Sequence, residues 1–349
     1  MNKKFQIGKK IISENKPIFI IAEVGVNHNG DVKIAKKLIK LAKKSGVNAI
    51  KFQTFFPEEG ISKHAPLAEY QSKSTSVKTQ LEMVNKLQLT QKNFLDLKNY
   101  AEKLNLIFLS TPFDVKSVKL LNDLKTLAYK ISSGDITNKL LLEKVAECKK
   151  PMIISTGMSN MREIQEAIKW ITNKGCKSFS IMQCTSNYPT KIEDCNLLAI
   201  KNMKEKFDVQ VGFSDHTKNS IASILAMGLG ISFIEKHITL DHNMEGPDHK
   251  MSLDPKELKN FVNDIRDAET ALGSGNKECL PCEIEVKKLV RKSIVVLRDV
   301  KKDEILSNND LGLKRPGIGM EPKNLHKLIG RKVRRDISAD ELIDKKDLY

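Results

Sequence analysis

Short apolar runs alternate with stretches of helical spacing along most of the chain. Each run is rich in Ile, Val, Phe or Met and stops at polar residues, which is typical of a buried strand. The runs are Ile18–Glu23, Ala49–Gln53, Ile107–Thr111, Ala128–Ser132, Met152–Ser155, Phe179–Thr185, Val209–Ser214 and Phe233–His237. The amphipathic stretches that follow them are Val32–Lys44, Gln91–Leu104, Val115–Leu124, Lys139–Cys148, Met161–Thr172, Asp194–Lys206, Asn219–Gly228 and Pro255–Leu272. Eight strands that alternate with eight helices predict a closed parallel (β/α)8 TIM barrel.

An open doubly wound sheet is the alternative architecture. The count of eight strands and the absence of a Gly-rich dinucleotide turn favour the barrel. Residues 5–13 predict a short hairpin before the first barrel strand. Residues 55–90 form a long loop in which Glu69–Leu87 has helical spacing, and insertions of this length at the active face of a barrel act as lids or specificity loops. The polar residues of interest in it are Tyr70, Gln71 and Lys73.

The composition changes after Leu272. Residues 273–285 read GSGNKECLPCEIE and predict a linker between a barrel domain, residues 1–272, and a small domain, residues 286–349. The small domain combines short strands, one-turn helices and Gly/Pro corners. Its loop Lys314–Gly319 holds Arg315 beside a Pro-Gly pair, which suits the presentation of a guanidinium to an oxygen-rich ligand. An exposed charged turn explains this loop equally well.

Two histidines close two neighbouring strands of the predicted barrel. His216 ends the run that begins near Val211, and His237 ends the run at Phe233–His237. Because parallel neighbours lie ~5 Å apart, equivalent positions at two strand ends can hold one ligand jointly. The pair therefore favours a shared metal or substrate site over two histidines that only hydrogen-bond at strand ends.

Two lysines lie within apolar strands. Lys51 and Lys130 would each be costly to bury without an anion, and residues two apart share a face of a strand, as Lys51 does with Gln53. A single structural ion pair would explain one such lysine. Two of them favour a phosphate or carboxylate cradle, because four hydroxyl residues end neighbouring strands: Thr111, Ser133, Ser155 and Ser214.

Composition excludes several classes of protein. No apolar run reaches the ~18 residues of a membrane span, and the first residues resemble no secretory signal, so we expect a cytoplasmic protein. The formal net charge of the 349 residues is +16, but the lysines are spread over nearly every predicted helix. This spread argues against nucleic-acid binding and is consistent with a solvated surface whose field attracts anions. The six cysteines follow no disulfide framework, and Cys279 and Cys282 are too few for a zinc site.

A series of motifs at the strand ends resembles the sialic acid synthase family. The motifs are AEVGVNHNG, IKFQT, STPFD, YKISSGD, IISTGM, CTSNYPT, GFSDHT, IEKHITLD, GPDHKMSLDP and KRPGIG, in order from about Ile18 to the C-terminus. The resemblance implies a TIM barrel followed by an antifreeze-like (SAF) domain. It also implies condensation of phosphoenolpyruvate with an N-acetylated amino sugar, N-acetylmannosamine or a 2,4-diacetamido relative, to a nonulosonic acid and phosphate. The bacterial N-acetylneuraminate and legionaminate synthases look most similar, and the pseudaminate synthases less so around residues 70–81.

The resemblance assigns roles to individual residues. It implies that His216 and His237 hold a divalent metal, usually Mn²⁺, and that Glu23 lies beside the reacting carbons. The residues that would grip phosphoenolpyruvate are Lys51, Lys130, Thr111, Ser133, Ser155 and Ser214, and those on the sugar side are Gln53, Tyr188 and Asp248. Asp135 stands where the family often has Glu, which leaves its role and the sugar preference open.

The resemblance also implies an assembly and a mechanism. Arg315 would reach the amino sugar from the SAF domain of a partner chain in a domain-swapped homodimer. C3 of phosphoenolpyruvate would attack the sugar aldehyde, and water would add at C2.

Two rival functions remain: another phosphoenolpyruvate-condensing barrel enzyme that uses a phosphorylated aldose, and a binding protein with an inert barrel.

Overall fold

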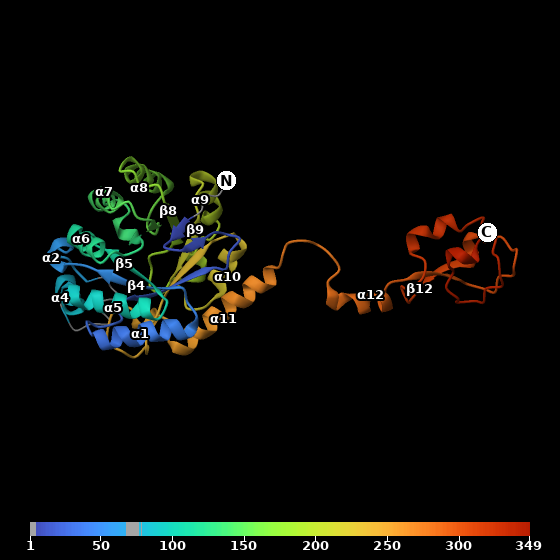
Figure 1. The fold of residues 1–349 in the computed structure, drawn as a ribbon, viewed down its shortest axis with the longest axis horizontal. Helices are drawn as coiled ribbons and strands as arrows, with labels where there is room; N and C mark the ends of the chain where they lie inside the picture. The colour runs from blue at the N-terminus through green and yellow to red at the C-terminus, as the bar shows by residue number, and fades with distance from the viewer. Residues whose placement is uncertain (1–4, 68–76, 78) are drawn as a thin grey trace. The chain divides into compact units, whose positions relative to one another are not determined.

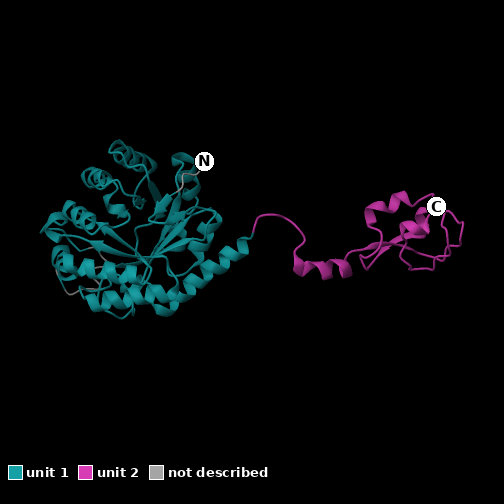
Figure 2. Cartoon of the chain, viewed as in Figure 1, with its two compact units in different colours: residues 1–273 teal, residues 274–349 magenta. Residues whose placement is uncertain are grey.

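The computed structural model describes residues 5–67, 77 and 79–349. The chain divides into two compact units, residues 1–273 and 274–349, which Figure 2 distinguishes by colour. Each unit has a hydrophobic core of its own.

Unit 1 is built around an eight-stranded parallel sheet that is nearly closed. Hydrogen bonds join its strands in the order β5-β4-β3-β10-β9-β8-β7-β6, and β5 and β6 contact each other across the remaining gap. The helices lie outside the strands (Figure 1). This arrangement confirms the predicted TIM barrel. The strands are β3 (Phe19–Gly25), β4 (Ala49–Thr54), β5 (Ile107–Pro112), β6 (Tyr129–Ile131), β7 (Met152–Ser155), β8 (Phe179–Cys184), β9 (Val211–Asp215) and β10 (Phe233–His237).

Most barrel helices begin where a polar side chain caps the first turn. Asp31, Asp114 and Asp254 each accept a hydrogen bond from a backbone N–H of the helix that follows, which satisfies donors that have no partner within the helix. The helices are α1 (Val32–Ser45), α2 (Pro57–Gly60), α4 (Gln80–Leu87), α5 (Gln91–Lys103), α6 (Val115–Asp123), α7 (Lys139–Glu147), α8 (Met161–Asn173), α9 (Ala199–Phe207), α10 (Ile221–Gly228) and α11 (Pro255–Leu272). Apart from α2, a short helix in the loop of residues 55–90 that the sequence pattern does not predict, they agree with the expected positions at all but two places.

The two differences lie in long loops. The helix expected from Asp194 begins only at Ala199, because Ile192–Asp194 is a separate 3-10 turn and Asn196 has a left-handed φ of 43°. Of the helix expected over residues 69–87, the structure describes residues 77 and 79–87. Within them, helix α4 begins at Gln80, and Thr79 caps it. Tyr70, Gln71 and Lys73 lie outside the described residues.

The predicted N-terminal hairpin closes the barrel at the N-terminal ends of its strands. Its strands, β1 (Phe5–Ile7) and β2 (Lys10–Ile12), pair in antiparallel fashion. Phe5, Ile7 and Ile12 are buried against the apolar residues that begin the barrel strands, among them Phe19 and Phe233. The interior is therefore apolar at this end, and its buried charged groups gather at the opposite, C-terminal end of the strands.

Unit 2 is a small domain with few regular elements. Helix α12 (Ile284–Val290) precedes an antiparallel pair, β11 (Ser293–Val296) with β12 (Leu311–Lys314). Aliphatic residues from across the unit form its core: Ile294, Val296, Val300, Leu306, Leu311, Leu328, Val333, Ile337, Ile343 and Leu348. Across the described part of the chain, every helix is too short or too polar to cross a lipid bilayer.

We expect Phe5→Ala to lower the free energy of unfolding of unit 1 by about 3–5 kcal/mol, because it opens a cavity beneath the barrel. The ring is 2% exposed and stacks on Phe233, with 6.2 Å between centroids. Urea unfolding followed by circular dichroism measures the change. Lys10→Ala, at an exposed position of the same hairpin, is the control. Equal stability of the two variants would show that the hairpin does not hold the barrel together.

Candidate active site

Because side chains alternate along each strand, one set of polar side chains points toward the barrel interior. Neighbouring residues of a strand point to opposite sides, so Lys51 and Gln53 face the interior while Phe52 packs among the apolar residues outside. The inward residues line a cavity of about 400 Å³ at the C-terminal ends of the strands. It contains eleven of the sequence-predicted residues: Glu23, Lys51, Gln53, Thr111, Lys130, Ser133, Ser155, Tyr188, Ser214, His216 and His237.

A second cavity of about 530 Å³ adjoins the first. The two share Gln53, Tyr188 and His237 among their lining residues, and the second adds Asp135 and Asp248. The structure thus brings together every predicted site residue of the barrel. Apolar side chains from α2, α4 and the loops supply much of its remaining wall: Val26, Phe55, Phe56, Pro57, Ile61, Met83, Val84, Leu87, Phe113 and Pro247.

Two lysines and two glutamates form a buried charge cluster at the floor of the first cavity. Lys51 Nζ lies 3.0 Å from Glu23 Oε2 and 3.5 Å from Glu235 Oε1, and Lys130 Nζ lies 3.4 Å from Glu235 Oε1. All four side chains are at most 4% exposed. The opposite charges balance, which is the condition for burying ions at this depth.

Hydroxyl groups from neighbouring strands complete the cluster. Lys51 Nζ donates to Thr111 Oγ1 at 3.1 Å, and Lys130 Nζ donates to Ser155 Oγ at 2.6 Å. Ser214 Oγ donates to Glu235 Oε1 at 3.3 Å. Ammonium and hydroxyl groups that converge on one cavity can bind the oxygens of a phosphate or a carboxylate.

The two glutamates of the cluster differ in acidity. Burial raises the pKa of the Glu23 carboxyl to about 7, although Lys51 opposes the shift. Burial would also raise the pKa of Glu235, but Lys130 and Lys51 together hold it below its usual value. Glu235 is therefore the permanent counter-ion of both lysines, whereas Glu23 is the carboxyl that exchanges a proton most readily.

His216 and His237 lie side by side at the ends of β9 and β10. Their ring centroids are 5.4 Å apart, and the Tyr188 ring lies 4.2 Å from that of His216. His216 Nδ1 is 2.8 Å from the carbonyl oxygen of Thr185. In the tautomer that donates to this carbonyl, Nε2 of His216 carries the lone pair that a metal would take.

The His237 ring differs from the His216 ring in its hydrogen bonding. His237 Nδ1 is buried and has no hydrogen-bond partner among the described residues, and it lies 4.0 Å from Asp248 Oδ2. Burial, with the nearby His216, lowers the pKa of His237 well below its usual value, so the ring is neutral. A neutral, unpartnered imidazole nitrogen beside a carboxylate fits a divalent metal ion.

Asp248 and Gln53 connect the histidines to the second cavity. Gln53 Nε2 donates to Glu23 Oε1 at 3.3 Å, and burial raises the pKa of Asp248 to about 6. Gly25, at the bulge that ends β3, has a φ of +56°, and a Cβ atom there would lie 3.5 Å from oxygens of both Asp248 and Glu23. The glycine permits this turn and keeps the space between the two carboxyls open.

Sequence patterns assign no role to Glu235 or Cys184. Glu235 is two residues before His237 on β10, so strand alternation alone already placed it on the inner face. Cys184 Sγ lies 3.9 Å from His216 Nδ1, and although burial opposes the shift, His216 lowers the pKa of this thiol to about 7. No sequence pattern marked this contact, because it joins side chains of two strands, β8 and β9.

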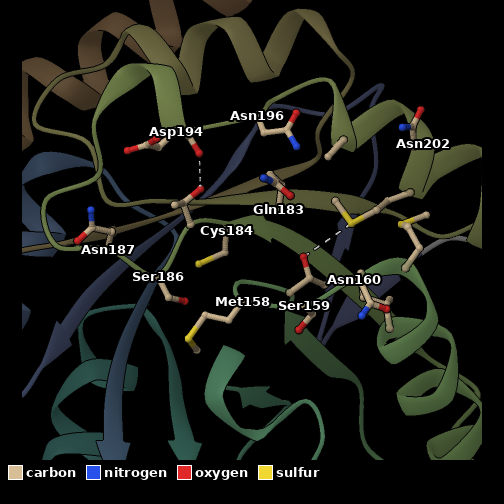
Figure 3. A pocket seen from close by; sticks show the side chains of 16 residues that line it. Met158, Ser159, Asn160, Gln183, Cys184, Ser186, Asn187, Asp194, Asn196 and Asn202 are labelled. Carbon is tan, nitrogen blue, oxygen red and sulfur yellow. Dashed lines mark hydrogen bonds between the residues drawn. The ribbon is translucent and has the colours of Figure 1, made fainter. Parts of the chain in front are cut away.

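A larger hollow of about 620 Å³ lies beside the charged cavity, next to α8 and α9. Figure 3 shows amides and hydroxyls around it, including Gln183, Asn187 and Asn196. Among the described residues, its lining contains no lysine, arginine or histidine. Cys184, Ser186 and Met158 line both spaces. The buried lysines, glutamates and histidines line the smaller cavity, so we assign the chemistry to that one.

Arg315 belongs to unit 2. Its side chain is exposed on a loop that hydrogen bonds hold in place. Ser293 Oγ donates to the carbonyl oxygen of Pro316 at 2.7 Å, and the N–H of Gly317 donates to that of Lys288 at 2.7 Å. The loop therefore presents the guanidinium to solvent.

Comparison with known proteins identifies the family. Residues 38–277 match the NeuB family model, and residues 291–348 match the SAF domain. The chain belongs to the NeuB family. It is 44% identical to the N,N'-diacetyllegionaminic acid synthase of Campylobacter jejuni, over 94% of this chain and 99% of that protein. It is 36% identical to the human N-acetylneuraminate-9-phosphate synthase, over 94% of this chain and 91% of that one.

A solved NeuB-type structure has the same fold. The N-acetylneuraminic acid synthetase of Leptospira borgpetersenii, crystallised with citrate, is 35% identical and superposes with a TM-score of 0.73. The similarity covers 82% of this chain and 95% of that chain. These findings confirm the family resemblance and the C-terminal SAF domain that the motifs predicted.

We expect Glu235→Gln to lower the free energy of unfolding by about 3–5 kcal/mol, because it leaves two buried lysines without their shared counter-ion. Urea unfolding measures the effect. Glu147→Gln is the control, since Glu147 pairs with Lys144 in solvent, and it should leave stability unchanged. A Glu235→Gln variant as stable as the control would contradict the charge balance described above.

Proposed function

We propose that the barrel condenses phosphoenolpyruvate with an N-acetylated amino sugar to give a nonulosonic acid and phosphate. One observation carries the proposal: two buried lysines, balanced by two glutamates, face a cavity beside two histidines. Lys51, Lys130 and the hydroxyls of Thr111, Ser133, Ser155 and Ser214 bind the phosphate and carboxylate of phosphoenolpyruvate. Fixed in this cradle, its C3 is held within reach of the sugar aldehyde.

His216 and His237 would hold a divalent metal ion, Mn²⁺ or a similar one. Such an ion acts as a Lewis acid toward the aldehyde oxygen of the open-chain sugar. When the new C–C bond forms, positive charge develops at C2 of phosphoenolpyruvate, and the Glu23 carboxylate stabilises it. With a pKa of about 7, Glu23 also accepts a proton from the water that adds at C2. That proton passes to the oxygen of the former aldehyde, which becomes a hydroxyl, and the C2–O bond to phosphate then breaks as the C2 hydroxyl loses its proton to the departing phosphate and becomes the ketone.

The second cavity supports a 2,4-diacetamido sugar in preference to N-acetylmannosamine. Its wall combines polar groups with an apolar part that includes Phe55, Met83 and Phe113. The apolar part accommodates acetamido methyl groups and a deoxygenated carbon at little desolvation cost, whereas sugar hydroxyls that face it stay unpaired. Gln53, Tyr188, Asp248 and Asp135 provide polar contacts. The name of the 44% identical relative agrees with this choice.

Phosphate release tests this function directly. The purified protein is mixed with phosphoenolpyruvate, Mn²⁺ and either N-acetylmannosamine, its 6-phosphate or a 2,4-diacetamido hexose. We expect release with the diacetamido sugar, loss of release after chelation, and restoration by Mn²⁺. Turnover of the 6-phosphate alone would show that the substrate is a phosphorylated amino sugar, as the name of the human relative suggests. Absence of turnover with every sugar would favour a binding protein.

Lys51→Ala and Lys130→Ala should each weaken phosphoenolpyruvate binding by about 1.5–3 kcal/mol, because each removes a charge-assisted contact to the anion. Sugar binding should change less. Isothermal titration calorimetry compares the two ligands, and Lys169→Ala, an exposed lysine on α8, is the control. Unchanged phosphoenolpyruvate isotherms in both variants would show that the anion binds elsewhere.

We also propose a domain-swapped homodimer in which Arg315 of one chain completes the sugar site of the other. The exposed loop that carries Arg315 and the family resemblance support this assembly. His216→Ala and Arg315→Ala should each be nearly inactive alone. If the chains exchange at random in a two-fold dimer, mixing should recover about a quarter of the wild-type sites. No recovery after verified exchange would place each Arg315 at the site of its own chain.

A further inference from the structure

A second buried ion pair lies behind the two histidines, on the outer face of the barrel. Asp215 of β9 and Lys236 of β10 are directly opposite each other in the parallel register. Their charged groups are 3.0 Å apart, and each residue is 1% exposed. Alternation turns their side chains away from the cavity, toward the helices α10 and α11. No step of the proposed reaction uses them.

The ammonium group of Lys236 has an acceptor for each of its three N–H bonds. One is Asp215 Oδ2, and the other two are the backbone carbonyls of Thr217 and Asn219. The charge also lies 5.4 Å from the centre of the Phe261 ring of α11. Lys236 therefore binds the loop that follows His216, not only the neighbouring strand.

Asp215 fixes the same loop from the other side. Its Oδ1 accepts the N–H of Thr217 at 2.8 Å, and its Oδ2 accepts the hydroxyl of Ser223, in α10, at 2.6 Å. His216 stands between Asp215 and Thr217 in the chain, so both of its neighbours are held. His237 directly follows Lys236. The pair thus holds the two strand ends that carry the histidines.

Packing alone does not account for this arrangement. Replacement of a buried ion pair by apolar side chains of similar volume is often neutral or stabilising. Apolar side chains would fill the same space between the strands and the helices, but they could not bind the carbonyls of Thr217 and Asn219 or the N–H of Thr217. What the ion pair adds is a defined conformation of the backbone on both sides of His216.

We propose that Asp215 and Lys236 are positioning residues that orient His216 and His237 for metal binding. The inference rests on the proposed metal site. Residues that orient metal ligands typically change metal affinity about 10- to 100-fold when they are replaced. The pair acts through the backbone of the strand ends and does not touch the substrate or the metal.

Mn²⁺ affinity, measured without substrate, tests the proposal. Free Mn²⁺ is followed by electron paramagnetic resonance during titration of the full-length wild-type protein and the neutral double variant Asp215→Asn/Lys236→Met. We expect the dissociation constant of the double variant to rise at least about tenfold. Ser223→Ala, which removes one hydrogen bond from Asp215, should raise it less. This milder variant decides the question if the double variant does not fold.

A matched control separates orientation from stability. Ile20→Ala removes a buried side chain near the start of β3, in the same layer between strands and helices, and Ile20 pairs with Ile234, three residues before His237. It should lower the melting temperature and leave the Mn²⁺ dissociation constant unchanged. An unchanged dissociation constant in the Asp215/Lys236 variant, or an equal rise in Ile20→Ala, would overturn the positioning role alone. Wild-type binding that survives His216→Ala would instead overturn the metal site itself.

Discussion

The interior of this barrel depends on the mutual neutralisation of Lys51, Lys130, Glu23 and Glu235. None of these side chains could be buried as an ion by itself, because the loss of hydration costs several kcal/mol for each charge. When Glu23 is ionised, they form a neutral cluster of side chains from four strands, β3, β4, β6 and β10. The cluster thereby requires the correct register of strands that are far apart in the sequence, and it makes the fold and the reactive cavity parts of one arrangement.

The two ends of the barrel interior have opposite chemistry for a related reason. The N-terminal hairpin closes one end with Phe5 and Ile7, so this layer is packed as an ordinary apolar core. Charged groups are concentrated at the other end, where the strands meet their loops. Because this packed apolar layer fills the space next to the charge cluster, the lysine side chains cannot turn into the core. They stay directed toward the cavity. Such preorganisation lowers the cost of binding an anion.

The strand ends of β9 and β10 show how one backbone serves both faces of the barrel. Inside, His216 and His237 lie next to each other; outside, Asp215 and Lys236 form an ion pair at the same height. Alternation of side chains makes this division unavoidable, since each histidine has a neighbour on the opposite face. The residues outside the barrel can therefore influence the geometry inside it without entering the cavity.

The amino-acid sequence by itself determined the order of strands and helices, the barrel and most of the candidate site. Strands and helices are local patterns of period two and 3.6, so the eight repeats could be counted from the chain. Inward positions at the strand ends followed from the same alternation, which is why Lys51, Lys130, His216 and His237 could be grouped in advance. The motifs around them also carried the family resemblance.

The tertiary structure decided which side chains form ion pairs and hydrogen bonds with one another. The pairing of Glu235 with both lysines, the contact of Cys184 with His216 and the ion pair of Asp215 with Lys236 join different strands, and no local pattern encodes such distances. The delayed start of α9 also depends on the turns before it, where Asn196 adopts a left-handed conformation. Contacts and pKa values depend on three-dimensional distances of a few ångströms, whereas periodicity reports only the face on which a side chain lies.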